Sequence, residues 1–491
     1  MKESLKITFW KGQSHQLMTV FCALTLLSIL VGIGTEFYFL MALPLVFLGA
    51  FLAILDFKMI FWLLLAAIPF SMETDFASGF SIDLPDEPLM MILMGIYVLF
   101  ILKPSRFMSD KFIRHPITIV LLVHLLWILA TAFTSQNHLV SFKYFAAKLW
   151  YVTTFYFLAA SLVKSDRDWK TVFWLVFIPL VITVVYVLVR HAGMGFSFKS
   201  INKMVLPFYR NHVNYACLLS LFMPLIWYAS MWYKRFSWKW WVILGGAMII
   251  LLGIQFSYTR AAYVALMGAV GASFIIQFRL VKYVLAAGTI AAIVFVVHVQ
   301  HNNKYLDYAP DFNKTITHEN FGNLISATSK GEDISTMERV YRWVAGMHMV
   351  RERPGVGFGP GNFSRFYRGY AVTNFKTYVS DNEDNSGVHS YYLMTAIEQG
   401  IIGLVIFLAM VFLVLLKGES IYHQTTKTFR KRQVMSVMLS FIVILTLLLI
   451  NDMVETDKVG TFFFFCMAIL VNADLKNHAD ANALESAPAS K

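Results

Sequence analysis

The sequence predicts an all-α, polytopic helical membrane protein with about fourteen transmembrane helices, within a range of about 12–14, and a mostly helical external loop domain. Composition is the first reason, because 58% of the 491 residues are hydrophobic and only 14% are charged, whereas soluble domains carry about 25% charged residues. The second reason is that the apolar residues form long, nearly charge-free blocks. Blocks of this kind favour helical spans over β-barrel strands, which alternate polar and apolar residues.

The expected spans divide the chain into four parts. We expect the first eleven helices within residues 1–299, an external (periplasmic) loop domain at residues 300–388, the last three helices within residues 389–472, and a disordered cytoplasmic tail at residues 473–491. No small-residue cleavage site follows the first span, so we interpret it as an uncleaved helix and not as a signal peptide. The individual spans are residues 17–34, 37–55, 57–72, 88–102, 116–134, 143–163, 170–190, 212–232, 240–256, 259–277, 282–299, 389–416, 434–451 and 459–472.

Lys and Arg gather in alternate loops, which predicts the orientation. Cations concentrate on the cytoplasmic side of membrane proteins, and residues 73–87 contain no Lys or Arg. With an even number of spans, both termini are then expected in the cytoplasm. The cationic loops are residues 103–114, 164–170, 234–239, 279–282 and 417–432.

Two loops on the expected external side are basic in spite of this rule. Arg190, Lys199, Lys203 and Arg210 follow the seventh span, and the segment at residues 298–388 is also rich in Lys and Arg. A specific anionic partner would account for these charges, and so would contact with anionic lipid headgroups. Charge alone leaves both interpretations open.

The long external segment contains an amphipathic helix followed by a glycine-rich stretch. Apolar residues recur at three- and four-residue spacing over 336–353, and Pro354-Gly355 ends the pattern. Arg339 and Arg342 are neighbours on this helix, so they form either a phosphate clamp or part of a solvated face. The stretch 355–361 lacks the residues of a phosphate-binding loop, which favours a tight turn between two helices.

Three further residues lie at or near the expected external edge of the membrane. Arg260 occupies the connection between the ninth and tenth spans, where it could simply extend to the headgroups. His389 opens the twelfth span, and Glu398 lies deeper within it. A plain helix end and a hydrogen bond between helices are the structural alternatives for these two, although an intramembrane carboxylate is by default a functional candidate.

The predicted topology places four arginines and one histidine on the same side of the membrane. Permanent cations with one titratable base suit a donor that carries a diphosphate leaving group and an acceptor that carries a hydroxyl. We find no metal-ligand spacing, and all three cysteines fall inside expected spans, so we expect no metal and no cofactor. The residues on this side are Arg210, Arg260, Arg339, Arg342 and His389.

Four segments, taken in order, resemble the O-antigen ligase/polymerase superfamily of bacterial membrane glycosyltransferases. In the second segment Thr259 replaces the family's usual Ser, and the long external loop before the fourth segment also matches. The resemblance covers about residues 200–416, and only the four segments together make it specific. They are Arg210–Ala216; Ser257–Arg260; Glu338–Arg339 with Trp343 and Arg353–Phe363; and His389–Leu393 with Glu398 and Gly400.

The resemblance implies a reaction and a set of roles. It implies transfer of a glycan from a polyprenyl-diphosphate carrier to an acceptor hydroxyl, on lipid A–core or a similar acceptor, at the outer face of the bacterial inner membrane, without nucleic acid. His389 would act as the base, with Arg260 and Arg339 stabilising the leaving diphosphate. A polymerase of the same superfamily and a transporter or flippase of an anionic lipid-linked glycan are the alternatives. Diphosphate or acceptor binding would fall to Arg210, Arg342, Asn214 and Glu398.

Overall fold

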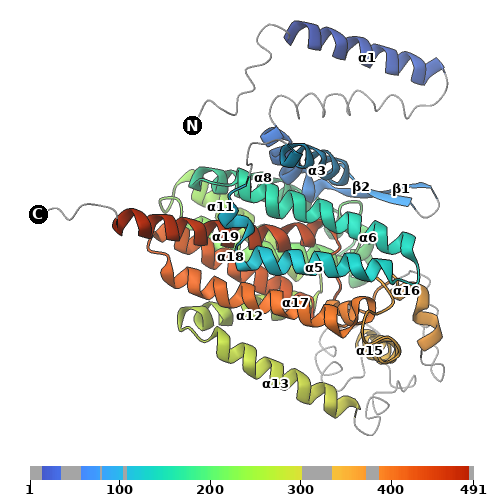
Figure 1. Cartoon of the computed structure of the whole chain (residues 1–491). Coiled ribbons are helices and arrows are strands. Elements are labelled where there is room, and N and C mark those ends of the chain that lie inside the picture. Colours follow the sequence, from blue (N-terminus) through green and yellow to red (C-terminus); the bar gives the residue numbers. More distant parts are fainter. Residues whose placement is uncertain are drawn as a thin grey trace, which may run out of the picture. The chain divides into compact units, whose positions relative to one another are not determined.

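A computed structural model gives the structure of the chain. It describes residues 14–34, 57–77, 80–102, 108–300, 334–371 and 386–485. These residues are predominantly helical (Figure 1), as the sequence predicts. The expected span at 37–55 and the end of the expected tail at 486–491 lie outside the described residues. The chain divides into two compact units, Met1–Phe107 and Met108–Lys491.

The first unit contains helices and one β-hairpin. Helix α1 covers Ser14–Gly34, the apolar helical stretch Phe57–Phe70 follows, and α3 covers Asp86–Leu102. Between the last two, β1 (Met72–Ala77) and β2 (Phe80–Leu84) pair antiparallel. This hairpin departs from the all-α prediction, which treated residues 73–87 as a loop. Phe80–Leu84 does alternate apolar and polar residues over five positions, whereas Met72–Ala77 does not, so only one of the two strands carries the local signal.

Eight helices among the described residues are long and apolar enough to cross a membrane, and all belong to the second unit. Helix α5 contacts both α6 and α17, and these helices extend in roughly the same direction in Figure 1. Each of the eight overlaps a span expected from the sequence. They are α5 (Pro116–Phe133), the continuous stretch His138–Leu162, α8 (Asp166–Ala192), α10 (His212–Ser230), α11 (Trp238–Gln255), α12 (Arg260–Gln277), α17 (Tyr391–Gln424) and α19 (Asp457–Glu485).

The stretch His138–Leu162 is built from three elements. Helix α6 (His138–Tyr151) passes into the π-helix η4 (Val152–Leu158), and α7 (Ala159–Leu162) completes it. Short α4 (Asp110–Ile113) precedes α5, while η5 (Phe198–Ser200) and α9 (Ile201–Met204) lie between α8 and α10.

Two more expected spans are helical but fall short of the length or apolarity of the eight. Helix α13 covers Val281–Gln300, with its apolar part at Val281–Val294. Helix α18 (Thr428–Leu447) begins with three consecutive cations and is then buried at nearly every position among α10, α12, α17 and α19. A helix that is apolar all round requires such surroundings. The structure therefore supports a multi-pass all-α membrane protein without confirming fourteen spans.

Loops with cationic residues meet at one end of this unit, which we call the basic end. There the His423 imidazole contacts the Ile276 carbonyl at 2.8 Å, and the Arg432 guanidinium donates to the Met231 carbonyl at 3.2 Å. These contacts join the connections α12–α13, α17–α18 and α10–α11. The opposite end collects the connections α5–α6, α11–α12 and α18–α19, and it holds the residues described in the next subsection.

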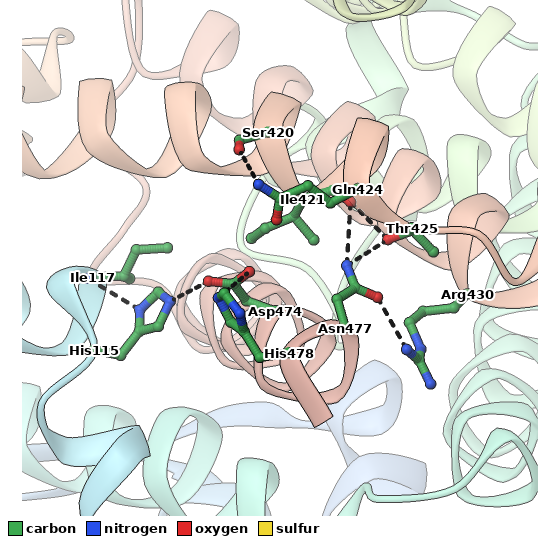
Figure 2. Close-up of polar contacts among 10 residues, drawn as sticks. All are labelled: His115, Ile117, Ser420, Ile421, Gln424, Thr425, Arg430, Asp474, Asn477 and His478. Atoms are coloured by element: carbon green, nitrogen blue, oxygen red, sulfur yellow. Dashed lines mark hydrogen bonds and ion pairs between the residues drawn. The ribbon is translucent and has the colours of Figure 1, made fainter. Parts of the chain in front are cut away.

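The C-terminal part of α19 corrects the prediction of a disordered tail from residue 473. The helix continues to Glu485, and its polar residues are bound at the basic end (Figure 2). The Asp474 carboxylate lies 3.0 Å from Nε2 of His115, and the Asn477 amide donates to the Thr425 hydroxyl at 2.8 Å. A polar sequence can be ordered in this way when its partners come from distant helices, which the local sequence does not reveal.

Candidate functional site

Helix α15 (Ile334–Glu352) lies against the start of α17 and is seen end on in Figure 1. The amphipathic helix predicted at residues 336–353 is thus confirmed. After α15 come the glycine-rich segment, short α16 (Phe363–Phe366) and η7 (Tyr367–Tyr370). These elements share a small apolar core with α17. Its fully buried members are Ala345, Met349, Phe358, Phe363, Tyr367, Val388 and Ile397.

The glycine-rich segment packs backbone to backbone against a break in α17. Gly400 has φ 74° and ψ 177°, which interrupts the helix, and a Cβ there would lie 2.0 Å from the Gly355 carbonyl oxygen. Gly357 has φ 70°, and a Cβ there would lie 2.5 Å from the backbone carbonyl carbon of Glu398. The Gly359 amide donates to the Glu398 carbonyl at 2.9 Å. These positions need glycine because of their left-handed φ and because no Cβ would fit.

The side chain of Glu398 completes the same junction. Its Oε2 accepts a hydrogen bond from the Gly361 amide at 2.8 Å, and its Oε1 accepts one from the Phe363 amide at 3.1 Å. The carboxylate is buried, and both of its oxygens are engaged by backbone donors. Glu398 therefore holds the backbone where the chain turns into α16. If Glu398 also binds substrate, it must do so with a carboxylate that already accepts these two hydrogen bonds.

Arg342 is a buried anchor for the segment that leads to His389. Its side chain is only 1% exposed, and Nη1 donates to the carbonyls of Ser386 at 3.0 Å and Gly387 at 2.5 Å. The guanidinium also lies over the ring of Tyr367, 5.6 Å from its centroid. The arginine predicted to bind a diphosphate thus fixes the backbone two residues before His389.

His389 lies two residues before the first residue of α17 and has a strained backbone conformation. Its φ is 57°, a left-handed value that non-glycine residues adopt rarely and that is enriched at functional sites. Nδ1 lies 4.0 Å from Oδ1 of Asp452, on the α18–α19 connection, and the His389 side chain is 33% exposed. A half-exposed imidazole beside a carboxylate can accept a proton from a bound hydroxyl.

The surroundings set the protonation of this pair. Burial, together with the positive charges of Arg342 and Arg339, lowers the pKa of His389 from 6.5 to about 3. Burial raises the pKa of Asp452 from 3.8 to about 6. At neutral pH His389 is therefore neutral while Asp452 is mostly ionised.

A second polar group lies beside the first. Lys148 on α6 is 2% exposed, and its Nζ contacts Oε1 of Glu455 at 2.6 Å. The hydroxyls of Tyr144 and Tyr391 donate to the same oxygen at 2.6 Å and 2.9 Å. Glu455 follows Asp452 on the α18–α19 connection, so this short connection contributes a carboxylate to each group.

Arg210 and Arg260 lie at the N-terminal ends of α10 and α12. The two ends are joined where the Thr259 hydroxyl donates to the His212 carbonyl at 3.4 Å. Arg210 is exposed and Arg260 half-buried. Asn214, in the first turn of α10, is half-buried, and its backbone N–H donates to Oδ1 of Asn211 at 2.9 Å. Tyr258, two residues before the start of α12, has φ 55°, a left-handed value like that of His389.

The structure thus gathers the predicted residues into two sets. Arg339, Arg342 and His389 are close enough for the two arginines to lower the pKa of the histidine, while Arg210, Asn214 and Arg260 form the other set. Sequence reasoning missed Asp452, Glu455 and Lys148. A cluster of acidic residues between the last two spans, and a lysine within a span, were signals that could have found them.

Among the residues that the structure describes, no group of three or more His, Cys, Asp or Glu side chains is placed to hold a metal ion. Comparison with known families gives one match. Residues 245–408 match the family described as O-antigen ligase. This range includes Arg260, Arg339, Arg342, His389 and Glu398, whereas Arg210, Asn214 and Asp452 lie outside it. No curated protein matches the chain.

Proposed function

Since the chain belongs to the O-antigen ligase superfamily, on the match over residues 245–408, we propose that it moves a glycan from a polyprenyl-diphosphate carrier to an acceptor hydroxyl. The observation that carries this proposal is the neutral, half-exposed His389 beside Asp452, with Arg339 and Arg342 around it. The acceptor proposed first is lipid A–core or a similar glycolipid, as for a ligase. A second glycan repeat unit, as for a polymerase, is the alternative.

The transfer needs one proton acceptor and a stabilised leaving group. His389 takes the proton of the acceptor hydroxyl as the new bond from that oxygen to the anomeric carbon forms. The bond from the anomeric carbon to the diphosphate breaks, and the diphosphate leaves with the electron pair. Because Nδ1 faces Asp452, Nε2 is the nitrogen available to the acceptor, and the carboxylate stabilises the imidazolium that results.

Arg339 is proposed to stabilise the charge that develops on the leaving diphosphate. Such a donor is typically worth about 3–4 kcal/mol in the transition state. Its charge also lowers the pKa of His389, so a bound diphosphate would offset that charge and make the imidazole more basic. The base would then be strengthened when the donor is in place.

Arg210 and Arg260 are proposed to hold the diphosphate of the carrier at the N-terminal ends of α10 and α12. Both stand where a helix begins, and the positive end of the helix dipole adds to their charge. Asn214 would add a neutral donor on the same turn. Arg342 and Glu398 are assigned to supporting the site, because Arg342 donates to backbone carbonyls and Glu398 accepts from backbone amides.

The loop charges support a location in the bacterial inner membrane with both termini in the cytoplasm. The basic end of the second unit would then face the cytoplasm. The end that carries His389 would face the periplasm, where flipped lipid-linked glycans are presented.

The test uses the purified protein in lipid vesicles with a polyprenyl-diphosphate glycan and a glycolipid acceptor. We expect covalent transfer, and we expect its loss in His389→Ala and Arg260→Ala, while Arg365→Ala, which removes an exposed cation of α16, keeps it. Full activity of both site variants would end the assignment. Translocation of the donor without transfer would instead identify a transporter.

The glycolipids of a deletion strain separate the two enzyme types. Retained long lipid-linked polymer without attachment to the acceptor indicates a ligase. Single repeat units on the acceptor indicate a polymerase.

A further inference from the structure

Lys148 is a charged residue buried inside a candidate membrane span. Its side chain is 2% exposed within His138–Leu162, and the rings of Tyr144, Tyr391 and Phe464 surround its ammonium group. A lysine in such a place is costly unless it is paired, and it marks a functional position by default. Its partner is Glu455 at 2.6 Å.

The Glu455 oxygen ties together three elements that are distant in the sequence. Lys148 and Tyr144 reach it from α6, and Tyr391 reaches it from the first residue of α17. The Tyr391 amide also donates to the carbonyls of Leu448 and Asn451, at 3.0 Å and 3.2 Å. The α18–α19 connection is therefore held against the start of α17 by both its backbone and its Glu455 side chain.

The same two segments carry the pair that faces the proposed substrate. His389 lies two residues before Tyr391, and Asp452 directly follows Asn451. Any movement of the α18–α19 connection relative to α17 would change the 4.0 Å separation between Nδ1 of His389 and Oδ1 of Asp452. Shifts of about 1 Å in a reacting group can cost about 100-fold in rate.

The backbone near Lys148 is also irregular. The π-helix Val152–Leu158 begins one turn after the lysine, and single π-turns inside helices are frequent at functional sites. A buried ion pair is weak support for stability, since apolar replacements are often equally stable. A role in fixing geometry explains the pair better than a role in stability.

We infer that the Lys148–Glu455 ion pair is a positioning element for the proposed transfer, because it sets where Asp452 lies relative to His389. Lys148 and Glu455 touch no reacting atom in this role. They act through the α18–α19 connection and Tyr391. The effect on transfer rests on the proposed function. The claim that the ion pair holds the α18–α19 connection against α17 can be tested without measuring activity.

The kinetic test compares Lys148→Met, Glu455→Gln and the double variant with wild type. Each single variant should lower kcat about 10–100-fold while the KM for the lipid-linked donor changes less than about twofold. The double variant leaves no unpaired buried charge, so it should recover thermal stability without recovering kcat. Recovery of wild-type kcat in the double variant would show a purely structural pair and overturn the inference.

Two further variants sharpen this comparison. Lys148→Arg keeps the charge and should retain kcat within about threefold, since an arginine can donate to the same carboxylate oxygen. Lys143→Met, the same substitution at an exposed position of α6, should leave kcat unchanged.

Hydrogen exchange followed by mass spectrometry supplies a readout that does not depend on activity. Deuterium uptake in residues 386–392 and 448–456 should rise in Lys148→Met, Glu455→Gln and the double variant, and should stay at the wild-type level in Lys143→Met. Unchanged uptake in the single variants would overturn the inference whatever the activity. Absence of transfer by wild type, with increased uptake in the variants, would instead refute the proposed function and leave the positioning contact standing.

Discussion

Nδ1 of His389 and Oδ1 of Asp452 lie 4.0 Å apart where the α18–α19 connection meets the start of α17. The approach depends on Gly387, since a Cβ there would lie 1.4 Å from Oδ2 of Asp452. Arg342 fixes the carbonyl of the same glycine. The carboxylate is thus seated beside the imidazole by the backbone that leads to it.

The first prediction concerns the pH dependence of transfer. Burial raises the pKa of Asp452 to about 6, so below that pH the group is protonated and no longer stabilises an imidazolium. The pKa of His389 is about 3, so the histidine stays neutral throughout. We expect kcat/KM to fall as the pH drops through about 6, and Asp452→Asn to be about 100-fold slower without this step. A step that persists in Asp452→Asn would assign it to another group.

The first prediction extends to stability, because the same carboxylate should lower the free energy of unfolding at neutral pH. The folded pKa of Asp452 lies above its ordinary 3.8, so its stabilising contribution is complete below about pH 4 and is lost as the pH rises through about 6. Asp452→Asn should therefore raise the free energy of unfolding by about 1–3 kcal/mol at pH 8 and by much less at pH 4. Thermal unfolding at both pH values checks this. Equal effects at the two pH values would contradict the buried-charge explanation.

A second prediction compares three glycines where the glycine-rich segment packs against α17. Gly357→Ala and Gly400→Ala each place a Cβ against backbone at a left-handed φ, so we expect each to cost more than about 3 kcal/mol and to reduce the folded yield. Gly355→Ala is the matched control, because nothing lies within 4 Å of its Cβ position. It should stay within about 1 kcal/mol of wild type. Similar losses at all three positions would contradict the packing described here.

A third prediction separates two arginines on one helix. Arg342 is buried and donates to two backbone carbonyls. Arg342→Lys should therefore lower the melting temperature and weaken the hydrogen bonds that hold the backbone before His389. Arg339 is half-buried, and Arg339→Ala should lower kcat about 100-fold or more with little change in melting temperature. Kinetics and thermal unfolding of both variants decide the matter. A loss of kcat without a loss of stability in Arg342→Lys, together with a lower melting temperature in Arg339→Ala, would contradict the roles given to the two arginines.

Much of the fold could be predicted because long apolar blocks and helical periodicity are local signals. The helix predicted at 336–353, observed as α15, depends on such signals. The loop charges predicted a topology with His389 and Arg339 on one side of the membrane, and in the structure Arg339 lies close enough to His389 to lower its pKa.

The remaining features depend on contacts between distant segments. Asp452 and Glu455 lie on a short connection with no periodic pattern, and their importance depends on what α17 and α6 bring to them. From the sequence, Glu398 is an acidic residue within a span with no evident partner. In the structure it accepts hydrogen bonds from the backbone amides of Gly361 and Phe363. The length of α19 likewise depends on helices that bind its polar end.

The fourth prediction tests that end of α19. Truncation after Asn472 removes the contact of Asp474 with His115 and that of Asp480 with Arg430, at 3.0 Å and 2.8 Å. His115 is buried and would lose its carboxylate partner, at a cost of about 1–3 kcal/mol, so this truncation should lower the melting temperature clearly. Truncation after Glu485 keeps these contacts and serves as the control, with an expected change of less than about 1 kcal/mol. If the region after Asn472 were an unstructured tail, the two truncated proteins would melt at the same temperature.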